Sequence, residues 1–460
     1  MRFYPKTLLA GALFTALSCT VSFAQTPTPP VTTPPANSVK GFSKDIWKDG
    51  IRYNFDDKGD RFIKLTVMGQ IWARYTENNP GTTFNGAHRK DQADISLRRV
   101  RMQLFIQPHQ RWFIYSQFGI NNFNYASVRK PSFFLHDFTV EYMPVKNHLY
   151  IGGGLQSWGT SSRFAASAVS SIMGLDIPTY QEPLNDQTDQ FVRNLGIYMK
   201  GSINKLNFRL SANKPFAFSK SDNYVAASAL SSSYAQFSPM DPKFELAGYV
   251  EWNFLDHEID KIPYKAGSYL GTKRIFNIGA GARWQPQATW YKTGAGDTAY
   301  SAMIIGTIDV FAEMPFKKGG QTAFNIYGAY TYSNFGPGFL RQIGANGVAT
   351  GSTLPASHIY GNGNTAPLVG TGNSLYFQGG IITPAIPKTE IKFMPYATFL
   401  VADYRVIKGP ITMYESGINL LIKGNALKLT AGWQNRPFFA TPTFKAQRLN
   451  MGIIQMQFSI

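Results

Sequence analysis

The segment Ile95–Gly119, ISLRRVRMQLFIQPHQRWFIYSQFG, decides the fold class of this 460-residue chain. Apolar side chains occupy every second position from Val100 to Ile106, and Arg99 and Arg101 lie between them. A β-strand turns successive side chains to opposite faces, so one face of this strand is apolar and the other is charged. A Pro-His-Gln-Arg break then separates it from a second alternating run. The segment therefore predicts a hairpin whose charged face meets either water or a polar lumen.

The same kind of segment recurs to the end of the chain and gives sixteen expected strands of about 10–14 residues. They are Phe62–Thr76, Ile95–Ile106, Trp112–Phe123, Ser132–Met143, His148–Trp158, Phe191–Ser202, Lys205–Asn213, Lys243–Phe254, Ile275–Gln285, Ala302–Met314, Gln321–Tyr332, Ser374–Thr383, Thr389–Ala402, Ile411–Ile422, Ala426–Asn435 and Gln447–Ile460. A sheet in lipid must close on itself, because hydrocarbon offers its backbone no hydrogen-bonding partner. We expect an all-β fold: a transmembrane antiparallel β-barrel of about 16 strands.

The connections between these segments alternate in length, as expected for long extracellular loops and short periplasmic turns. Long connections follow odd-numbered strands, and one of them, Gly159–Gln190, is the best candidate to fold into the lumen. Its part Ser162–Met173 is rich in small and apolar residues and predicts a short helix; a large external cap is the alternative. Leu255–Arg274 is longer than the rule prefers for a periplasmic turn.

The N-terminal sequence predicts export. Basic residues precede an apolar run, and Ser22-Phe23-Ala24 offers the small residues of a cleavage site, so residues 1–24 read as a cleaved signal peptide. Residues 25–61 read as a Pro/Thr-rich linker and a short periplasmic lead, and residues 62–460 as the barrel. The one cysteine, Cys19, lies in the signal peptide, so we expect no disulfide in the mature chain. The predicted location is the outer membrane of a Gram-negative bacterium.

Composition supports the same class. Aromatic residues make up 15% of the chain and charged residues only 16%, and beyond the signal peptide no apolar run approaches the length of a membrane helix. The formal net charge of +18 comes from scattered basic residues, which together with export argues against nucleic acid as a partner. Aromatic residues near strand ends, Trp72 and Trp158 among them, predict two interfacial girdles.

Several motifs bear on the family. They are the Arg-Arg-rich strand with its turn into an aromatic strand, IGGGL at Ile151–Leu155, SRF at Ser162–Phe164, DQFVRNLGIY at Asp189–Tyr198, KPF at Lys214–Phe216 and YLGTK at Tyr269–Lys273. The chain resembles the phosphate-selective (O and P type) porin family of Gram-negative outer membranes over roughly residues 60 to 460. The resemblance implies a sixteen-stranded, homotrimeric barrel that passes small hydrophilic solutes and often anions. Membrane lipid and lipopolysaccharide are its further expected partners.

The expected constriction loop departs from that family. An anion channel is expected to present basic residues there, whereas Gly159–Gln190 carries one basic residue, Arg163, against Asp176, Glu182 and two further aspartates. Resemblance to this family is therefore no evidence that phosphate is the transported solute. We take Arg163, Asp176 and Glu182 as the candidate charged residues of the constriction.

Strand alternation places a set of basic residues on the lumen face. They are Lys64, Arg74, Arg99, Arg101, Arg209, Arg283, Lys392 and Lys428. A charge on the lipid face costs about 2–4 kcal/mol near the midplane, which favours the inward assignment. One interpretation is a solvated wall whose charges pair with acids such as Asp137 and Glu141. The other is a basic ladder of Lys64, Arg74, Arg99 and Arg101 that passes anions along the wall.

The sequence favours a channel function over two alternative functions. The expected function is passive diffusion of small hydrophilic solutes with a weak anion preference, phosphate or other oxyanions included. The alternative is a plugged barrel that serves as a structural or partner-binding component of an outer-membrane assembly. A barrel hydrolase is a third class, but no metal pair, Gly-rich phosphate loop or nucleophile elbow is found, and His136 is expected to point outward beside Asp137. We expect no catalytic residue, metal or cofactor.

Overall fold

The computed structural model describes residues 40–219, 227–258, 260–317, 320–353, 360–440 and 446–460. The predicted signal peptide (residues 1–24) and the Pro/Thr-rich part of the predicted linker lie outside the described residues. The strands of the main sheet form where the sequence alternates with a period of two, because only an extended chain can then bury one face and expose the other.

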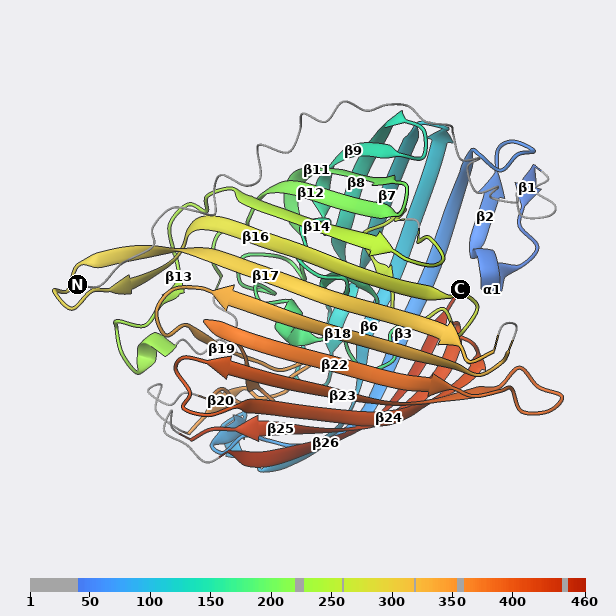
Figure 1. The fold of residues 1–460 in the computed structure, drawn as a ribbon. Coiled ribbons are helices and arrows are strands. Elements are labelled where there is room, and N and C mark those ends of the chain that lie inside the picture. Colours follow the sequence, from blue (N-terminus) through green and yellow to red (C-terminus); the bar gives the residue numbers. More distant parts are fainter. Residues whose placement is uncertain (1–39, 220–226, 259, 318–319, 354–359, 441–445) are drawn as a thin grey trace. The chain divides into compact units, whose positions relative to one another are not determined.

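Sixteen strands of the described residues form a closed antiparallel barrel, as predicted (Figure 1). In order around the barrel they are β3 (Phe62–Glu77), β6 (Asp91–His109), β7 (Trp112–Phe123), β8 (Phe134–Val145), β9 (Leu149–Gln156), β11 (Asn194–Ile203), β12 (Leu206–Lys214), β14 (Glu245–Asn253), β16 (Ile275–Lys292), β17 (Thr298–Pro315), β18 (Ala323–Asn334), β22 (Gly372–Ile382), β23 (Lys392–Tyr404), β24 (Ile411–Lys423), β25 (Leu427–Phe438) and β26 (Gln447–Ser459). Pairing of β26 with β3, from Met451↔Thr76 to Ser459↔Met68, closes the ring.

The remaining elements are short and lie in connections or in the lead. They are β1 (Gly41–Phe42), α1 (Ile46–Asp49), β2 (Ile51–Asn54), β4 (Thr82–Phe84), β5 (Ala87–His88), η1 (Phe164–Ala166), β10 (Ser167–Ala168), η2 (Thr179–Gln181), η3 (Ala227–Ala229), β13 (Gln236–Phe237), β15 (Lys265–Ala266), β19 (Leu340–Ile343), β20 (Gly351–Ser352) and β21 (Ala366–Gly370). The expected helix at Ser162–Met173 is wrong: only the single 3₁₀ turn η1 forms there. No helix among the described residues is long and apolar enough to cross a membrane.

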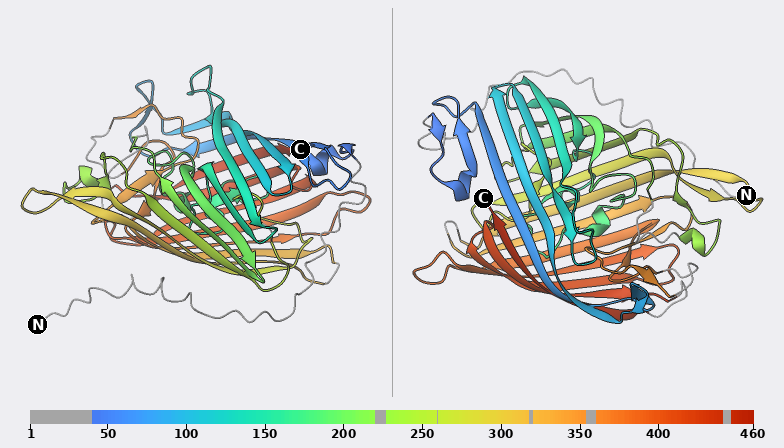
Figure 2. Two further views of the ribbon diagram at one scale, coloured as in Figure 1. Left: turned by 90° about the horizontal axis from the view of Figure 1, so that it is seen from above. Right: turned by 180° about the vertical axis from the view of Figure 1, so that it is seen from behind.

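The longest connections lie at one end of the barrel, which gives it a loop end and a turn end (Figures 1 and 2). The third loop (residues 157–193) and the sixth loop (residues 335–371) are among the long ones at the loop end. Turns of two or three residues join β6 to β7, β8 to β9 and β11 to β12 at the other end. Residues 254–274, here called the inner turn, are the long exception.

The two faces of the wall differ in chemistry. Outward side chains are apolar and exposed, as at Ile95, Ile197 and Ile454, whereas Gln70 and Gln457 face inward and are fully buried. An outer surface of this kind suits hydrocarbon, and the polar inner surface keeps its hydrogen bonds inside the barrel. Trp72 and Trp158 are also buried, so their assignment to an interfacial girdle is wrong.

The hydrophobic core lies inside the barrel, between loop segments and the wall. In its largest cluster, Phe164 and Tyr180 of the third loop pack against wall residues such as Phe311, Tyr327 and Leu400. The ring of Phe164 lies 4.2 Å from that of Tyr327, centroid to centroid. The third loop therefore folds into the lumen, and its apolar residues hold it there.

The lead completes one edge of the sheet. β26 and the residue that follows it, Ile460, pair with β3 only as far as Val67. The remaining residues on the same edge of β3 pair with β2, from Ile51↔Leu65 to Asn54↔Phe62. Trp47 of α1 packs edge-on against Phe458 at 5.5 Å. An otherwise open strand edge at the seam of the barrel is thus covered.

Candidate functional site

The third loop crosses the lumen and is hydrogen-bonded to the wall on several sides. The amide nitrogen of Leu175 donates to Glu415 of β24 at 2.8 Å, and Lys428 of β25 donates to the carbonyl of Ile172 at 2.7 Å. Farther around the wall, Asp309 of β17 accepts from the amide of Arg163 at 2.7 Å. These bonds hold the third loop across the inside of the barrel. Most residues of the loop are buried.

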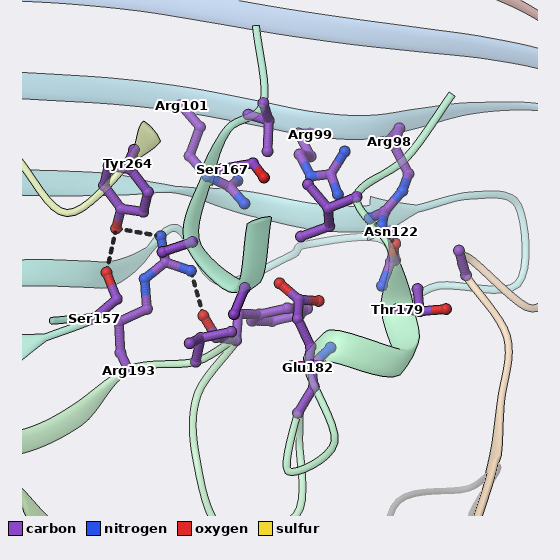
Figure 3. A pocket seen from close by; sticks show the side chains of 18 of the residues that line it. Arg98, Arg99, Arg101, Asn122, Ser157, Ser167, Thr179, Glu182, Arg193 and Tyr264 are labelled. Carbon is purple, nitrogen blue, oxygen red and sulfur yellow. Dashed lines mark hydrogen bonds between the residues drawn. The ribbon is translucent and has the colours of Figure 1, made fainter. Parts of the chain in front are cut away.

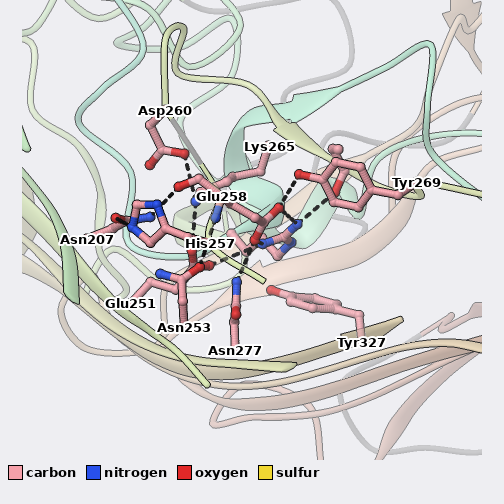
Figure 4. Close-up of polar contacts among 12 residues, drawn as sticks. Asn207, Glu251, Asn253, His257, Glu258, Asp260, Lys265, Tyr269, Asn277 and Tyr327 are labelled. Carbon is pink, nitrogen blue, oxygen red and sulfur yellow. Dashed lines mark hydrogen bonds and ion pairs between the residues drawn. The ribbon is translucent and has the colours of Figure 1, made fainter. Parts of the chain in front are cut away.

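The inner turn enters the lumen from the turn end and meets the third loop, which the sequence analysis did not predict. Its strand β15 pairs in parallel with β10 of the third loop, Ser167↔Lys265 and Ala168↔Ala266. Lys265 also forms ion pairs with Glu251 of β14 at 2.7 Å and with Asp260 at 2.8 Å. The two segments therefore close on each other inside the barrel (Figure 4).

Arg163 is the centre of this contact, here called the clamp. Its guanidinium donates to both carboxylate oxygens of Glu258 at 2.7 Å, to Glu251 at 3.1 Å and to the carbonyl of Ala266 at 2.9 Å. Burial disfavours the charge, but Glu258 and Glu251 outweigh it and raise the pKa of Arg163 above its ordinary value. Likewise, burial opposes ionisation of Glu258, yet Arg163 and Lys265 lower its pKa to about 2. The clamp is thus a charged network in which Arg163 and Lys265 are both paired with carboxylates.

A β-bulge in β6 turns two consecutive arginines into the lumen. Gln70 of β3 pairs with Arg99 and Ile71 pairs with Leu97, so Arg98 is the extra residue between them. Arg98 donates to Asp176 at 2.5 and 3.0 Å, and Arg99 also binds Asp176. Arg98 was not among the residues predicted to face the lumen, because strict alternation from Arg99 would turn it outward and periodicity alone does not reveal a bulge.

Arg101 lies next to them on the same strand and is held by uncharged groups. Its guanidinium donates to the carbonyls of Val100 at 3.0 Å and Ile120 at 2.8 Å, and to the side chain of Asn121. Opposite it on β7 is Gly119, where an added Cβ would lie 2.0 Å from the carbonyl oxygen of Val100 and 3.1 Å from the Arg101 guanidinium. Gly119 therefore leaves the space that Arg101 occupies.

A fourth arginine from the third loop joins this group, and the sequence analysis missed it. Arg193 forms an ion pair with Asp137 of β8 at 3.3 Å and donates to the hydroxyl of Tyr264 in the inner turn at 2.6 Å. Tyr264 in turn donates to Asp137 at 2.6 Å. Only the tertiary contact of three distant segments brings these groups together, so no local sequence signal marks them.

These arginines line a cavity of about 410 Å³, here called the arginine cavity (Figure 3). Its lining runs from Arg341–Asn346 of the sixth loop, past Arg98, Arg99 and Arg101, to Ser459 at the turn end of β26. The cavity lies between the third loop and the wall of β3, β6 and β7. It therefore follows one side of the lumen over much of its length.

Glu182 of the third loop faces the arginines across this cavity (Figure 3). Burial, helped by the nearby Asp176, raises the pKa of Glu182 to about 8, against the opposing effect of Arg99. At neutral pH its carboxyl group is thus mostly protonated. A protonated Glu182 does not offset the positive charge of the arginines. The acidic residues counted in the third loop therefore reduce that charge less than their number suggests.

The other predicted lumen residues are distributed around the wall. Arg74 is fully buried in an ion pair with Asp94 at 2.6 Å, and Lys64 is half-buried near the turn end with its ammonium over the ring of Phe105. Neither lines the arginine cavity. The structure thus brings Arg99 and Arg101 together but separates them from Lys64 and Arg74, the other members of the expected ladder.

The four remaining basic residues have separate surroundings. Arg283 pairs with Glu245 at 2.8 Å, and Arg209 donates to the carbonyls of Pro263 at 3.2 Å and Ser162 at 3.0 Å. Lys428 supports the third loop as described above. Lys392 is half-buried at the first position of β23. They hold loops to the wall or lie apart from the arginine cavity.

Two side-chain assignments from the sequence are wrong. Asp137 and Glu141 do not pair with Arg99 or Arg101: Asp137 binds Arg193, and Glu141 binds Lys200 at 2.9 Å. His136 is not outward but fully buried, because a bulge in β8 opposite Gln117 and Phe118 turns it inward, where its ring lies 4.1 Å from that of Phe134, centroid to centroid. Its two ring nitrogens have no hydrogen-bond partner.

No group of three or more His, Cys, Asp or Glu side chains that could hold a metal ion occurs within the described ranges. Chemically, the arginine cavity offers guanidinium donors to an anion, and the clamp offers only groups that already bind each other.

Comparisons with known proteins place the fold. No protein-family model matches the chain, and no curated protein matches it. Among solved structures, OprB of Pseudomonas putida is similar with a TM-score of 0.52 at 9% identity, over 86% of this chain and 94% of that one. The outer membrane channel DcaP of Acinetobacter baumannii matches with a TM-score of 0.46 at 12% identity, over 88% of this chain and 99% of that one. The chain thus has the fold of outer-membrane porins.

Proposed function

We propose that this protein is an outer-membrane porin through which small hydrophilic solutes diffuse passively, with a weak preference for anions. The observation that carries the proposal is the arginine cavity. It extends from the sixth loop to the last residues of β26 along a wall that bears Arg98, Arg99 and Arg101. A pore wall of like charge lowers the cost of entry for the opposite ion. Asp176 pairs with Arg98 and Arg99 and moderates that charge, which makes the preference weak.

The test is the reversal potential of the purified protein in a planar bilayer under a potassium chloride gradient. We expect discrete open steps and an anion-favouring potential. In the double variant Arg99→Glu with Arg101→Glu the potential should shift toward cations, whereas the charge-preserving Arg101→Lys should leave its sign unchanged. A wild-type potential that favours cations would contradict the anion preference. Phosphate and other oxyanions are candidate solutes to add, since the family that the sequence resembles often passes anions.

The tight filling of the lumen favours a second candidate, a plugged barrel that serves as a structural component of an outer-membrane assembly. The third loop and the inner turn meet at the clamp, where both are buried and charge-paired. A folded, heat-modifiable barrel that inserts into bilayers but carries no current would support this candidate and refute the first.

We further propose that the protein forms a homotrimer and that it contacts membrane lipid and lipopolysaccharide. Both proposals rest on the sequence resemblance. The exposed apolar band of the wall supports contact with lipid. Mass measurement of the detergent-solubilised protein tests the trimer, and a monomeric mass would exclude it.

A further inference from the structure

The arginine cavity has two chemically different sides. One side carries the guanidinium groups of β6. The facing side is built by the third loop, the inner turn and the sixth loop and carries both polar and apolar side chains. Its small and apolar part, here called the apolar side, consists of Ala165, Ala166, Ala168, Val169, Ile177, Val192, Ile262 and Ile343, and polar groups such as Arg193 and Tyr264 lie beside it. An inorganic anion can pair with guanidinium groups here but gains nothing from the apolar side.

The arginine side retains positive charge for a ligand. Arg98 and Arg99 share the single carboxylate of Asp176, and the partners of Arg101 are two carbonyls and an amide side chain. Two guanidinium groups thus face one carboxylate, and a third has only uncharged partners. Guanidinium groups bind carboxylates through paired hydrogen bonds, which makes this side suited to an anionic head group.

The apolar side is held in place at a conformational cost. Phe191 and Val192 both have positive φ angles, +50° and +74°, and the carboxylate of Asp189 accepts from the amide of Val192 at 3.0 Å. A β-branched residue rarely adopts this conformation. Such strain persists only where the surroundings enforce it, and here it sets Val192 among the lining residues and Arg193 between Asp137 and Tyr264.

We propose that the arginine cavity binds organic carboxylates that have an apolar body, in preference to inorganic phosphate. The carboxylate would lie on Arg99 and Arg101, and the apolar body against Val169 and Ile262. The volume of about 410 Å³ falls within the range of about 300–1,000 Å³ typical of small-molecule sites. This inference rests on the proposed channel function and names the class of solute that the channel selects.

Benzoate, acetate and phosphate serve as probes, added at equal ionic strength to single channels that carry chloride current. We expect benzoate to half-block the current at a concentration about tenfold lower than acetate or phosphate, since only benzoate buries an apolar ring. The variant Val169→Thr with Ile262→Thr makes the apolar side more polar, with nearly unchanged volume at residue 169 and the loss of one methyl group at residue 262, and should bring benzoate close to acetate. Arg101→Gln should weaken the block by all three anions.

Equal block by benzoate and acetate, or stronger block by phosphate, would overturn the inference while leaving the channel function intact. If the bilayer carries no current, the channel function fails instead. Calorimetric titration of benzoate into the detergent-solubilised protein then decides the inference separately, because binding to the cavity does not require an open path. Absence of benzoate binding, or equal affinity for phosphate, would refute it.

Discussion

Replacing Arg163 with methionine should release the third loop from the inner turn. The side chain of Arg163 is fully buried and gives its hydrogen bonds to Glu258, Glu251 and the carbonyl of Ala266. Methionine fills a similar volume but leaves the carboxylate of Glu258 buried without its cation. Removing one partner of such a buried pair costs about 3–5 kcal/mol.

That free energy sets the expected change in the population of displaced loops. At 1.4 kcal/mol per tenfold, a loss of about 3–5 kcal/mol raises the displaced population by about 10² to 4 × 10³-fold. A loop that leaves the lumen widens the path, so Arg163→Met should show larger single-channel conductance and more open-channel noise than the wild type. Arg163→Lys, which keeps the charge, should restore part of the wild-type behaviour.

The matched control is Arg283→Met. Arg283 also forms a buried ion pair, with Glu245 at 2.8 Å, but both residues belong to the wall, on β16 and β14. We expect a comparable loss of thermal stability, measured by heat modifiability on gels, without a change in conductance. If both variants lose stability and neither changes the conductance, the clamp does not hold the constriction.

Four further predictions concern the arginine cavity and the wall. Raising the pH from 6 to 9.5, values chosen to bracket the pKa of about 8, should ionise Glu182 and lower the anion preference measured as reversal potential; Glu182→Gln should abolish this change. The same proton, held in the folded state but lost from the unfolded chain above pH 4.5, should make the free energy of unfolding fall between pH 4.5 and about 8. Deleting residues 162–176 should raise the conductance and, because Asp176 is lost, the anion preference; an unchanged conductance would place the constriction elsewhere. Val100→Arg puts a charge on the outer face at a cost of about 2–4 kcal/mol and should impair insertion, whereas Val100→Leu should insert normally; normal assembly of the arginine variant would invert the face assignment.

The barrel itself was predictable from sequence because its signal is local. Each strand needs only alternating side chains, and each turn needs only a short polar interval, so all sixteen strands were found. Fifteen lie within four residues of their predicted bounds, whereas β16 runs on to Lys292, seven residues beyond its predicted end at Gln285. The bulges were not predictable, because an inserted residue changes the pairing of a strand without changing its composition. This is why Arg98, next to a correctly assigned Arg99, was missed.

The site depends on contacts between distant segments, and only part of it was predictable. Arg163, Asp176 and Glu182 were identified as charged residues of a long loop, but their partners come from β6, β14 and the inner turn. The unusual length of the inner turn was visible in the sequence. Length alone, however, does not predict whether a segment folds into the lumen or stays outside the barrel. Arg193 and Tyr264 became recognisable only once their shared contact with Asp137 was known.

The bulge at Arg98 has a consequence for how β6 tolerates substitution. From Arg99 toward the turn end the inward positions are odd-numbered, whereas from Arg98 toward the loop end they are even-numbered. A scan that places aspartate at each position of β6 in turn should therefore show a periodic pattern of membrane-assembled protein whose phase reverses once, between Leu97 and Val100. Deleting Arg98 alone should remove that reversal, because the strand would then keep one register along its whole length.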